Sequence, residues 1–185
     1  NSPYRCWYDF GPQYKGGYRS WWGFETLPEV NEETPSYVEF ITGPGGVIDT
    51  WLRRGAAGFR LDVADELPDE FIEKVRAAVK RVSPEKFLLG EVWEDATTKF
   101  GFNKRRTYLL GKGLDSVMNY PFKNAVLDFV KGKPAEQAMT EILTICEHYP
   151  APAMDTALNF LSTHDTERAL TVIADEPANG RGRAW

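Results

Sequence analysis

Short apolar runs of strand type alternate along the chain with stretches whose apolar residues recur at helical spacing. The clearest helix is predicted at 67–82, LPDEFIEKVRAAVKRV. Its acidic residues come early and its basic residues late, which is the charge order that the helix dipole favours. Its predicted core face consists of Phe71, Ile72, Val75, Ala78, Val79 and Val82. An earlier helix is predicted to end in VIDTWLRRG, with Gly55 as its stop after Arg53 and Arg54.

Buried strands are predicted at 56–62, 86–91, 114–120 and 157–163, where the sequence reads AAGFRLD, KFLLGE, LDSVMNY and ALNFLST. Helices are predicted from Pro121 to Val130, from Pro134 to about Tyr149, and from about Thr166. This alternation is typical of the βαβ units of a parallel sheet. Right-handed crossovers then favour a wound α/β structure.

The length of the chain limits how much of such a structure it can hold. A closed eight-stranded β/α barrel needs about 250 residues, and the 185 residues present correspond to four units. The chain is therefore either a small open sheet or about half of a barrel. We expect an aromatic-rich loop region at 1–34 and βα units at 35–185, all within one domain.

Aromatic residues crowd the opening segment, YRCWYDFGPQYKGGYRSWWGF, which has too many Gly and Pro residues for regular elements. Long loops in α/β enzymes commonly carry binding residues. Tyr18, Trp21 and Trp22 could stack on the apolar faces of sugar rings, but packing of the loop onto the body explains them equally well. Both interpretations stay open at this point.

Composition and charge exclude several classes of function. With 42% hydrophobic residues the chain can bury a core. The balance of 22 basic and 27 acidic residues, without a basic stripe, argues against nucleic-acid binding. No apolar run approaches the roughly 20 residues needed to cross a membrane, and NSPYR is not a signal peptide. We therefore expect a cytoplasmic protein. Cys6 and Cys146 form neither a metal motif nor a disulfide pattern.

Three acidic residues follow strand-type runs: Asp62 in GFRLDVADE, Glu91 in FLLGEVWED and Asp165 in NFLSTHDTE. Parallel β/α enzymes gather reactive groups at the carboxyl ends of their strands, so these carboxylates can converge on one site. Two close carboxyl groups are what the cleavage of a glycosidic bond requires. The alternative is that all three are helix N-caps or first-turn acids.

The same segments resemble a known enzyme family. GFRLDVADE, GEVWEDA and FLSTHDTERAL are similar to the motifs on the fourth, fifth and seventh barrel strands of the alpha-amylase family, glycoside hydrolase family 13. LPEVN at 27–31 resembles the short motif that precedes the fourth strand. WWGFETLPEVN, DSVMNYPF and STHDTER suggest the neopullulanase and cyclomaltodextrinase subgroup. The resemblance implies a partial (β/α)8 barrel, about strands four to seven, that acts on an α-glucan or maltooligosaccharide.

By this resemblance Asp62 is the nucleophile, Glu91 the general acid/base, and Asp165 the carboxylate that stabilises the transition state. The resemblance also implies a set of substrate-binding residues, namely Arg60, His164, Asn31, Trp93 and Arg168.

Strand geometry supports two of these roles. Arg60 and Asp62 point to the same face of a strand, where the guanidinium favours the ionised form that a nucleophile needs. Glu91 must instead hold a proton, which an apolar neighbour such as Trp93 favours. A nucleophile and an acid/base about 5–5.5 Å apart give a retaining reaction through a covalent glycosyl-enzyme.

Several family features are absent. The chain has no Asn-His pair of the third-strand motif, and no eighth strand is evident after Ala174. We therefore expect a barrel that is incomplete at both ends, whose exposed sheet edges favour a homodimer and whose isolated activity could be lost. Calcium accompanies the family by resemblance, but the sequence requires no cofactor and indicates no ligands.

Two alternative functions are open at this stage. One is an α-glucan transglycosylase, in which a sugar hydroxyl takes the place of water. The other is a non-catalytic member of the fold that binds sugar or protein, although such a scaffold has no chemical need for three acids.

Overall fold

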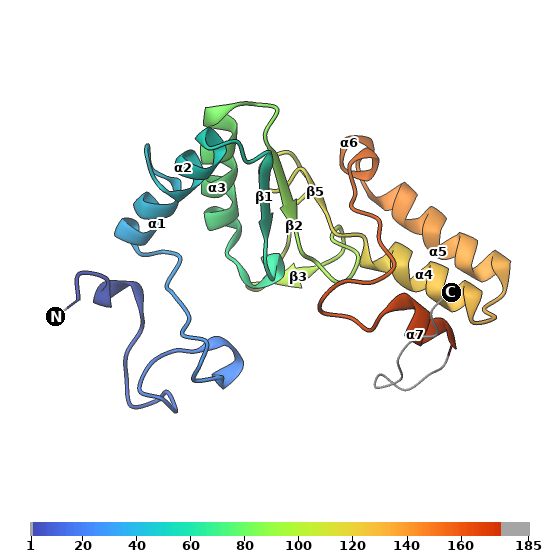
Figure 1. Ribbon diagram of the computed structural model, residues 1–185, viewed down its shortest axis with the longest axis horizontal. Helices are drawn as coiled ribbons and strands as arrows, with labels where there is room; N and C mark the ends of the chain where they lie inside the picture. Colours follow the sequence, from blue (N-terminus) through green and yellow to red (C-terminus); the bar gives the residue numbers. More distant parts are fainter. Residues whose placement is uncertain (1, 175–185) are drawn as a thin grey trace. The chain divides into compact units, whose positions relative to one another are not determined.

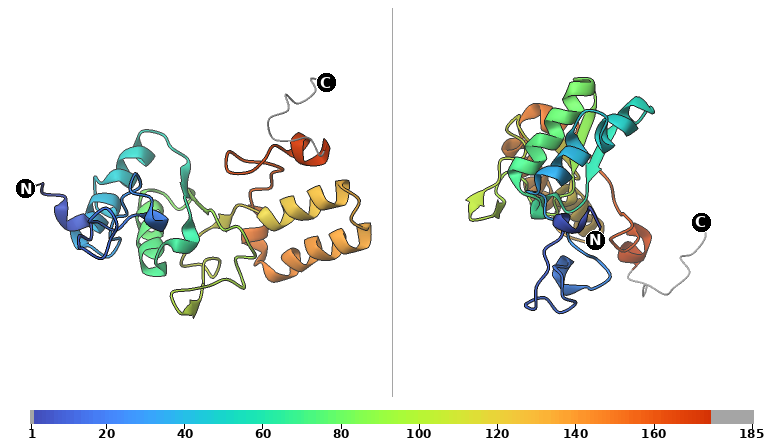
Figure 2. Two further views of the ribbon diagram at one scale, coloured as in Figure 1. Left: turned by 90° about the horizontal axis from the view of Figure 1, so that it is seen from below. Right: turned by 90° about the vertical axis from the view of Figure 1, so that its left-hand side faces the viewer.

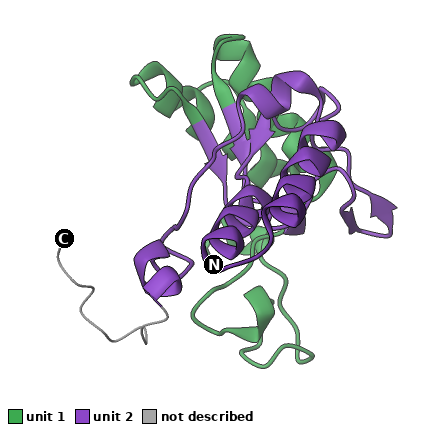
Figure 3. Cartoon of the chain, turned by 90° about the vertical axis from the view of Figure 1, so that its right-hand side faces the viewer, with its two compact units in different colours: residues 1–58, 67–87 green, residues 59–66, 88–185 purple. Residues whose placement is uncertain are grey.

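The computed structural model describes residues 2–174 (Figure 1). The chain divides into two compact units, residues 1–58 with 67–87 and residues 59–66 with 88–185 (Figure 3). We call them unit 1 and unit 2. Asp62, Glu91 and Asp165 all belong to unit 2, so the candidate site is described within that unit.

Three helices form the body of unit 1. They are α1 (Pro35–Thr42), α2 (Val47–Arg53) and α3 (Asp69–Val82), and each packs against the other two. On α3 the predicted core face is confirmed except for Val82, which is only half-buried; the buried members are Phe71, Ile72, Val75, Ala78 and Val79. The predicted stop of α2 is also confirmed, because Gly55 adopts a φ of 107°, which suits glycine.

An ion pair between the buried Asp49 and the partly exposed Arg81 fastens α2 to α3. The Arg81 Nη2 atom donates to Asp49 Oδ1 at 2.7 Å and to the carbonyl of Thr42 at 2.9 Å. The backbone N–H of Gly45 donates to the other carboxylate oxygen of Asp49 at 3.1 Å. The hydrogen bond from Gly45, and then that from Arg81, lower the pKa of Asp49 below its ordinary value. Asp49 therefore stays ionised where α1, α2 and α3 meet.

Residues 2–34 form the predicted long loop. Two 3₁₀ turns, Arg5–Trp7 and Trp21–Gly23, are its only helical pieces. Isolated backbone bridges, such as Tyr8 with Val30 and Phe10 with Tyr18, hold it together. Trp22 stacks on Trp21 with 4.8 Å between ring centroids and is 73% exposed. The loop is thus organised by backbone bridges rather than by a sheet.

Strands β1 (Gly58–Leu61), β2 (Phe87–Gly90) and β5 (Ser116–Val117) form a sheet in the order β1-β2-β5 (Figure 1). β2 and β5 pair in parallel, with Gly90 opposite Val117. Next to β2, the N–H of Glu91 donates to the carbonyl of Leu61 at 3.0 Å. The strands predicted at 56–62, 86–91 and 114–120 are confirmed, although the last is short.

The strand predicted at 157–163 is wrong as a regular element. Only a single parallel bridge joins Leu158 to Met118, flanked by a hydrogen bond from Asn119 N to Leu158 O at 2.9 Å. The pairing stops there because Asn119 is the N-cap of the helix Tyr120–Val130. The buried side chain of Asn119 also donates to Asn159 Oδ1 at 2.9 Å. Segment 157–163 still runs along the end of β5, which is the position that the βαβ pattern requires.

Helices α4 (Tyr120–Val130) and α5 (Ala135–His148) lie side by side in unit 2 (Figures 1 and 2). Gly132, with a φ of 107°, makes the turn between them. Helix α7 spans Ala169–Ala174 and so begins later than the predicted Thr166. Not predicted were α6 (Ala151–Asp155), the 3₁₀ turn Ala64–Glu66, and the hairpin of β3 (Phe100–Gly101) and β4 (Lys104–Arg105).

Candidate active site

Arg60 joins two of the three predicted acids. It lies on β1, and Asp62 follows the end of that strand, where Arg60 Nη1 hydrogen-bonds to Asp62 Oδ1. The other terminal nitrogen, Arg60 Nη2, lies 3.0 Å from Glu91 Oε1. This second contact is an ion pair in which the N–H is not aligned with the oxygen. One guanidinium therefore holds the two carboxylates beside each other at the carboxyl ends of β1 and β2.

The two carboxylates have different surroundings. The side chain of Asp62 is 75% exposed, whereas that of Glu91 is 4% exposed. Three donors hydrogen-bond to Glu91: Val63 N to Oε2 at 2.8 Å, Trp93 Nε1 to Oε1 at 3.0 Å, and Tyr120 Oη to Oε1 at 3.3 Å. Asp62 is thus open to a ligand, while Glu91 is buried in a fixed cage of donors.

The backbone of Val63 is strained where it contacts Glu91. Its φ is 42°, in the left-handed region that a β-branched residue rarely adopts. The next residue, Ala64, donates its N–H to the carbonyl of Glu91 at 3.0 Å. The strained turn after β1 therefore presents its N–H groups to Glu91, and such strain tends to gather at functional sites.

An aromatic group borders Glu91. Trp93 stacks on Tyr120 with ring centroids 4.5 Å apart and an interplanar angle of 13°. Phe160 meets Tyr120 edge-on at 4.8 Å. Trp93 remains 45% exposed, whereas Tyr120 is only 1% exposed. Trp93 can therefore offer aromatic surface to a ligand while Tyr120 supports it from inside.

Tyr120 was not among the residues predicted for the site. The pKa of its hydroxyl is raised, chiefly by burial. A hydrogen bond from Thr163 acts in the opposite direction. The charge of Glu91, the hydrogen bond to Glu91 and the charge of Asp165 raise the pKa further. One signal could have found it. Like the three acids, Tyr120 follows a strand-type run, SVMN, at its carboxyl end.

Asp165 and His164 lie in the turn that follows segment 157–163. His164 Nε2 is 3.0 Å from Asp165 Oδ2, and both side chains are exposed, by 77% and 38%. The N–H of Asp165 donates to Thr163 Oγ1 at 3.2 Å. Thr163 is in turn a hydrogen-bond partner of Tyr120, so the turn that carries Asp165 meets the residue that contacts Glu91.

Asn31 and Arg168 are the two remaining residues of the predicted binding set. Asn31 lies in unit 1, where its side chain donates to Asp9 at 3.4 Å and accepts from the N–H of Glu33 at 3.0 Å. Those are the contacts of a turn residue. Arg168 is exposed just before α7, and within residues 2–174 no ion pair joins it to Asp62, Glu91 or Asp165. Their roles stay predictions.

No metal site is evident among the described residues. Within 2–174, no group of three or more His, Cys, Asp or Glu side chains is placed to hold a metal ion. His148, at the end of α5, contacts Asp95 at 2.5 Å. The thiols of Cys6 and Cys146 are free and exposed. No helix in this part of the chain has the length and apolar character of a membrane span.

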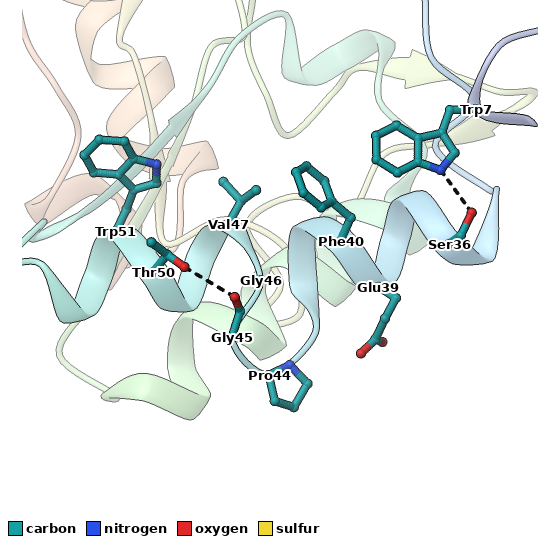
Figure 4. Close-up of a pocket in the computed structure, with 10 residues that line it drawn as sticks. All are labelled: Trp7, Ser36, Glu39, Phe40, Pro44, Gly45, Gly46, Val47, Thr50 and Trp51. Carbon is teal, nitrogen blue, oxygen red and sulfur yellow. Dashed lines mark hydrogen bonds between the residues drawn. The ribbon is translucent and has the colours of Figure 1, made fainter. Parts of the chain in front are cut away.

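Unit 1 has a pocket of its own, with a volume of about 540 Å³ (Figure 4). Its lining includes Trp7, Phe40 on α1 and Trp51 on α2. Trp7 Nε1 is held by Ser36 Oγ at 3.0 Å. None of the predicted site residues lines this pocket, so it contributes nothing to the site around Glu91.

A parallel β/α sheet with paired carboxylates at the ends of its strands defines a class of glycoside-cleaving enzymes. The family model "Alpha amylase, catalytic domain" matches residues 13–183. The chain belongs to the alpha-amylase family, and its fold is part of the (β/α)8 barrel of that family. The resemblance inferred from the motifs is thereby confirmed.

Individual relatives agree with the predicted subgroup. An amylopullulanase from Thermoanaerobacter thermohydrosulfuricus is 35% identical over 97% of this chain and 13% of its own length. A cyclomaltodextrinase from Geobacillus thermopakistaniensis is 32% identical over 92% of this chain and 32% of its own. The solved cyclic alpha-maltosyl-(1→6)-maltose hydrolase from Arthrobacter globiformis matches with a TM-score of 0.83 and 27% identity, over 95% of this chain and 39% of that structure. The chain thus spans less than half the length of each.

Proposed function

We propose that the protein is a retaining α-glycoside hydrolase that cleaves α-glucans or maltooligosaccharides through a covalent glycosyl-enzyme intermediate. The observation that carries the proposal is the placement of Arg60 between the exposed Asp62 and the buried Glu91. Two carboxylates held together in such different surroundings are suited to two different roles in one reaction.

Asp62 is the nucleophile in this proposal. Its side chain is 75% exposed, so a sugar can reach it, and Arg60 Nη1 hydrogen-bonds to its Oδ1 atom. An ionised carboxylate attacks the anomeric carbon and forms an ester with the sugar. Arg60 also fixes the direction of the carboxylate, because a guanidinium binds carboxylate oxygens in a defined geometry.

Glu91 is the general acid/base. It gives its proton to the departing sugar oxygen and later takes a proton from the water that hydrolyses the ester. In the structure three hydrogen bonds and the ion pair with Arg60 hold the two oxygens of Glu91 in place. This cage also fixes the acid's position before the second step.

Asp165 and His164 act on the sugar as its charge changes. The transition state resembles an oxocarbenium ion, so the partly exposed carboxylate of Asp165 stabilises it electrostatically. His164 can donate to a sugar hydroxyl. The exposed part of Trp93 provides a stacking surface for a glucose ring. Asn31 and Arg168 complete the proposed binding residues by resemblance alone.

The substrate class rests on the family and on the names of the relatives, among them amylopullulanase and cyclomaltodextrinase. The protein that carries this chain should release reducing sugar from maltodextrin. Glu91→Gln should lower the rate by about 10²–10⁴-fold, the usual contribution of a general acid/base. Glu94→Gln is the matched control, since Glu94 is 63% exposed and pairs with Lys99. Activity that survives Glu91→Gln would contradict the proposal.

Hydrolysis and transglycosylation share the same covalent intermediate and differ in its acceptor. Product analysis in the same assay separates them. Longer oligosaccharides formed at high maltooligosaccharide concentration would identify sugar hydroxyls as acceptors. Shorter products alone would identify water. The structural contacts of Glu91 serve both reactions equally, so we propose hydrolysis on the names of the relatives.

We further propose that residues 1–185 are one part of a single catalytic barrel domain and that the protein acts in the cytoplasm. We also propose that the free edge of the sheet supports a homodimer. β1 is an outer strand of the described sheet, so β2 pairs with only one of its two edges. A monodisperse monomer in light scattering would contradict the dimer, and recovery of the protein outside the cells would contradict the location.

A further inference from the structure

The hydrogen-bond partners of Glu91 are not equivalent. The N–H groups of Val63 and Trp93 and the guanidinium of Arg60 can only donate. A hydroxyl can both donate and accept, and Tyr120 supplies the one hydroxyl among the described groups that contact this carboxylate, at 3.3 Å from Oε1. When Glu91 carries a proton, Tyr120 is therefore the partner that can accept it in a hydrogen bond.

The Tyr120 hydroxyl continues into a short chain of hydrogen bonds. Its second partner is the side chain of Thr163, and Thr163 Oγ1 accepts from the N–H of Asp165 at 3.2 Å. Thr163 Oγ1 also lies 3.5 Å from Thr166 Oγ1. Every side-chain link in this chain is a hydroxyl, so its direction can reverse without any heavy atom moving. The chain links Glu91 to the turn that carries Asp165.

We propose that Tyr120 is a positioning residue for Glu91. The Tyr120 hydroxyl donates to Glu91 when that group is a carboxylate and accepts from it when that group is a carboxylic acid. The hydrogen bond between Tyr120 and Thr163 reverses its direction at the same time. The proposal rests on the acid/base role of Glu91 given above. The proton that leaves Glu91 goes to the departing sugar oxygen, while Tyr120 keeps its own proton and only turns it. Stacking with Trp93 and Phe160 holds the Tyr120 ring in place during that turn.

Charged groups surround Glu91. Arg60 contacts Glu91 from β1 and holds Asp62 with its other nitrogen, and the N–H of Asp165 meets Thr163. Removing the Tyr120 hydroxyl takes away a donor to the carboxylate, and hydrogen bonds to charged groups are the stronger ones. The loss should therefore be large only where the reaction needs Glu91 as an acid.

The test compares two substrates in Tyr120→Phe. A maltooligosaccharide has a poor leaving group that needs the acid, whereas an aryl α-maltoside with a nitrophenolate leaving group needs it little. We expect kcat/KM to fall by about 10- to 100-fold on the first and by less than about threefold on the second. Thr163→Val should lower the two kcat/KM values in the same pattern but by smaller factors. Thr163→Ser should restore both values.

Tyr149→Phe is the matched control. Tyr149 is equally buried, at 4% exposed, and its hydroxyl accepts from the N–H of Ala96 at 3.2 Å. It should leave the ratio of the kcat/KM values on the two substrates unchanged. Equal losses on both substrates, or no loss, in a folded Tyr120→Phe protein would overturn the role of Tyr120. If Glu91→Gln measured in parallel keeps the wild-type rate, the proposed function fails instead.

Discussion

The Nη2 atom of Arg60 lies 3.0 Å from Oε1 of Glu91, although the two residues come from neighbouring strands rather than from one segment. The other nitrogen of the same guanidinium holds Asp62. A planar fork that reaches two carboxylates at once cannot be replaced by the single ammonium of a lysine.

Arg60→Lys should therefore lower kcat/KM on maltooligosaccharides by about 10²–10³-fold, the cost usually seen when a preorganised donor is removed from an active site. Steady-state kinetics with a fold check by circular dichroism would measure it. Arg53→Lys is the control, because Arg53 is 72% exposed on α2 and should be neutral. Retention of more than half the activity in Arg60→Lys would count against the bridging role.

Asp49 predicts a pH dependence of stability. Its pKa is lowered in the folded protein, so its contribution is fully present above the unfolded value, about 3.9, and is lost as the pH falls through the folded pKa. Asp49→Asn should be clearly less stable than the wild type at pH 7, and the difference should shrink as the pH falls below 4. Urea denaturation at both pH values measures this.

A surface pair provides the contrast. Asp128 lies 2.8 Å from Lys133 and is 52% exposed, and solvent screens such pairs. Asp128→Asn should therefore change stability little at either pH. If Asp49→Asn behaves in the same way, the pair of Asp49 and Arg81 does not fasten α2 to α3.

The core face of α3 predicts the size of a packing defect. Ile72 is 1% exposed, so Ile72→Ala should destabilise the protein by about 2–5 kcal/mol and Ile72→Val by about 0.5–1.5 kcal/mol. Leu143→Ala, at a residue that is 50% exposed on α5, is the comparison and should cost much less. Urea midpoints at constant slope would test the order. An Ile72→Ala protein as stable as the wild type would mean that α3 is not packed as described.

Much of this fold could be predicted because the signals are local. The periodic face of α3, the Gly55 stop of α2 and the strand-type runs that end at Asp62 and Glu91 are each written within a few neighbouring residues. Because parallel strands end at one edge of the sheet, the neighbourhood of the acids followed from that pattern.

Other features depend on contacts that no local pattern contains. Segment 157–163 reads as a strand, but it makes only the bridge at Leu158 because the neighbouring chain turns into α4 at Asn119. Tyr120 lies in the site because it stacks on Trp93. Val63 reaches Glu91 because its backbone adopts a strained conformation. Periodicity records which residues are buried, not which hydroxyl or N–H meets a carboxylate.

If Asp62 attacks the sugar while Glu91 supplies the proton, the covalent intermediate can be trapped on Asp62. The Glu91→Gln protein would be incubated with α-maltosyl fluoride, whose leaving group needs little acid, then digested and mapped by mass spectrometry. We predict a maltosyl adduct on the peptide that contains Asp62, and none after Asp62→Asn. An adduct on the Asp165 peptide, or turnover without any adduct, would contradict the account.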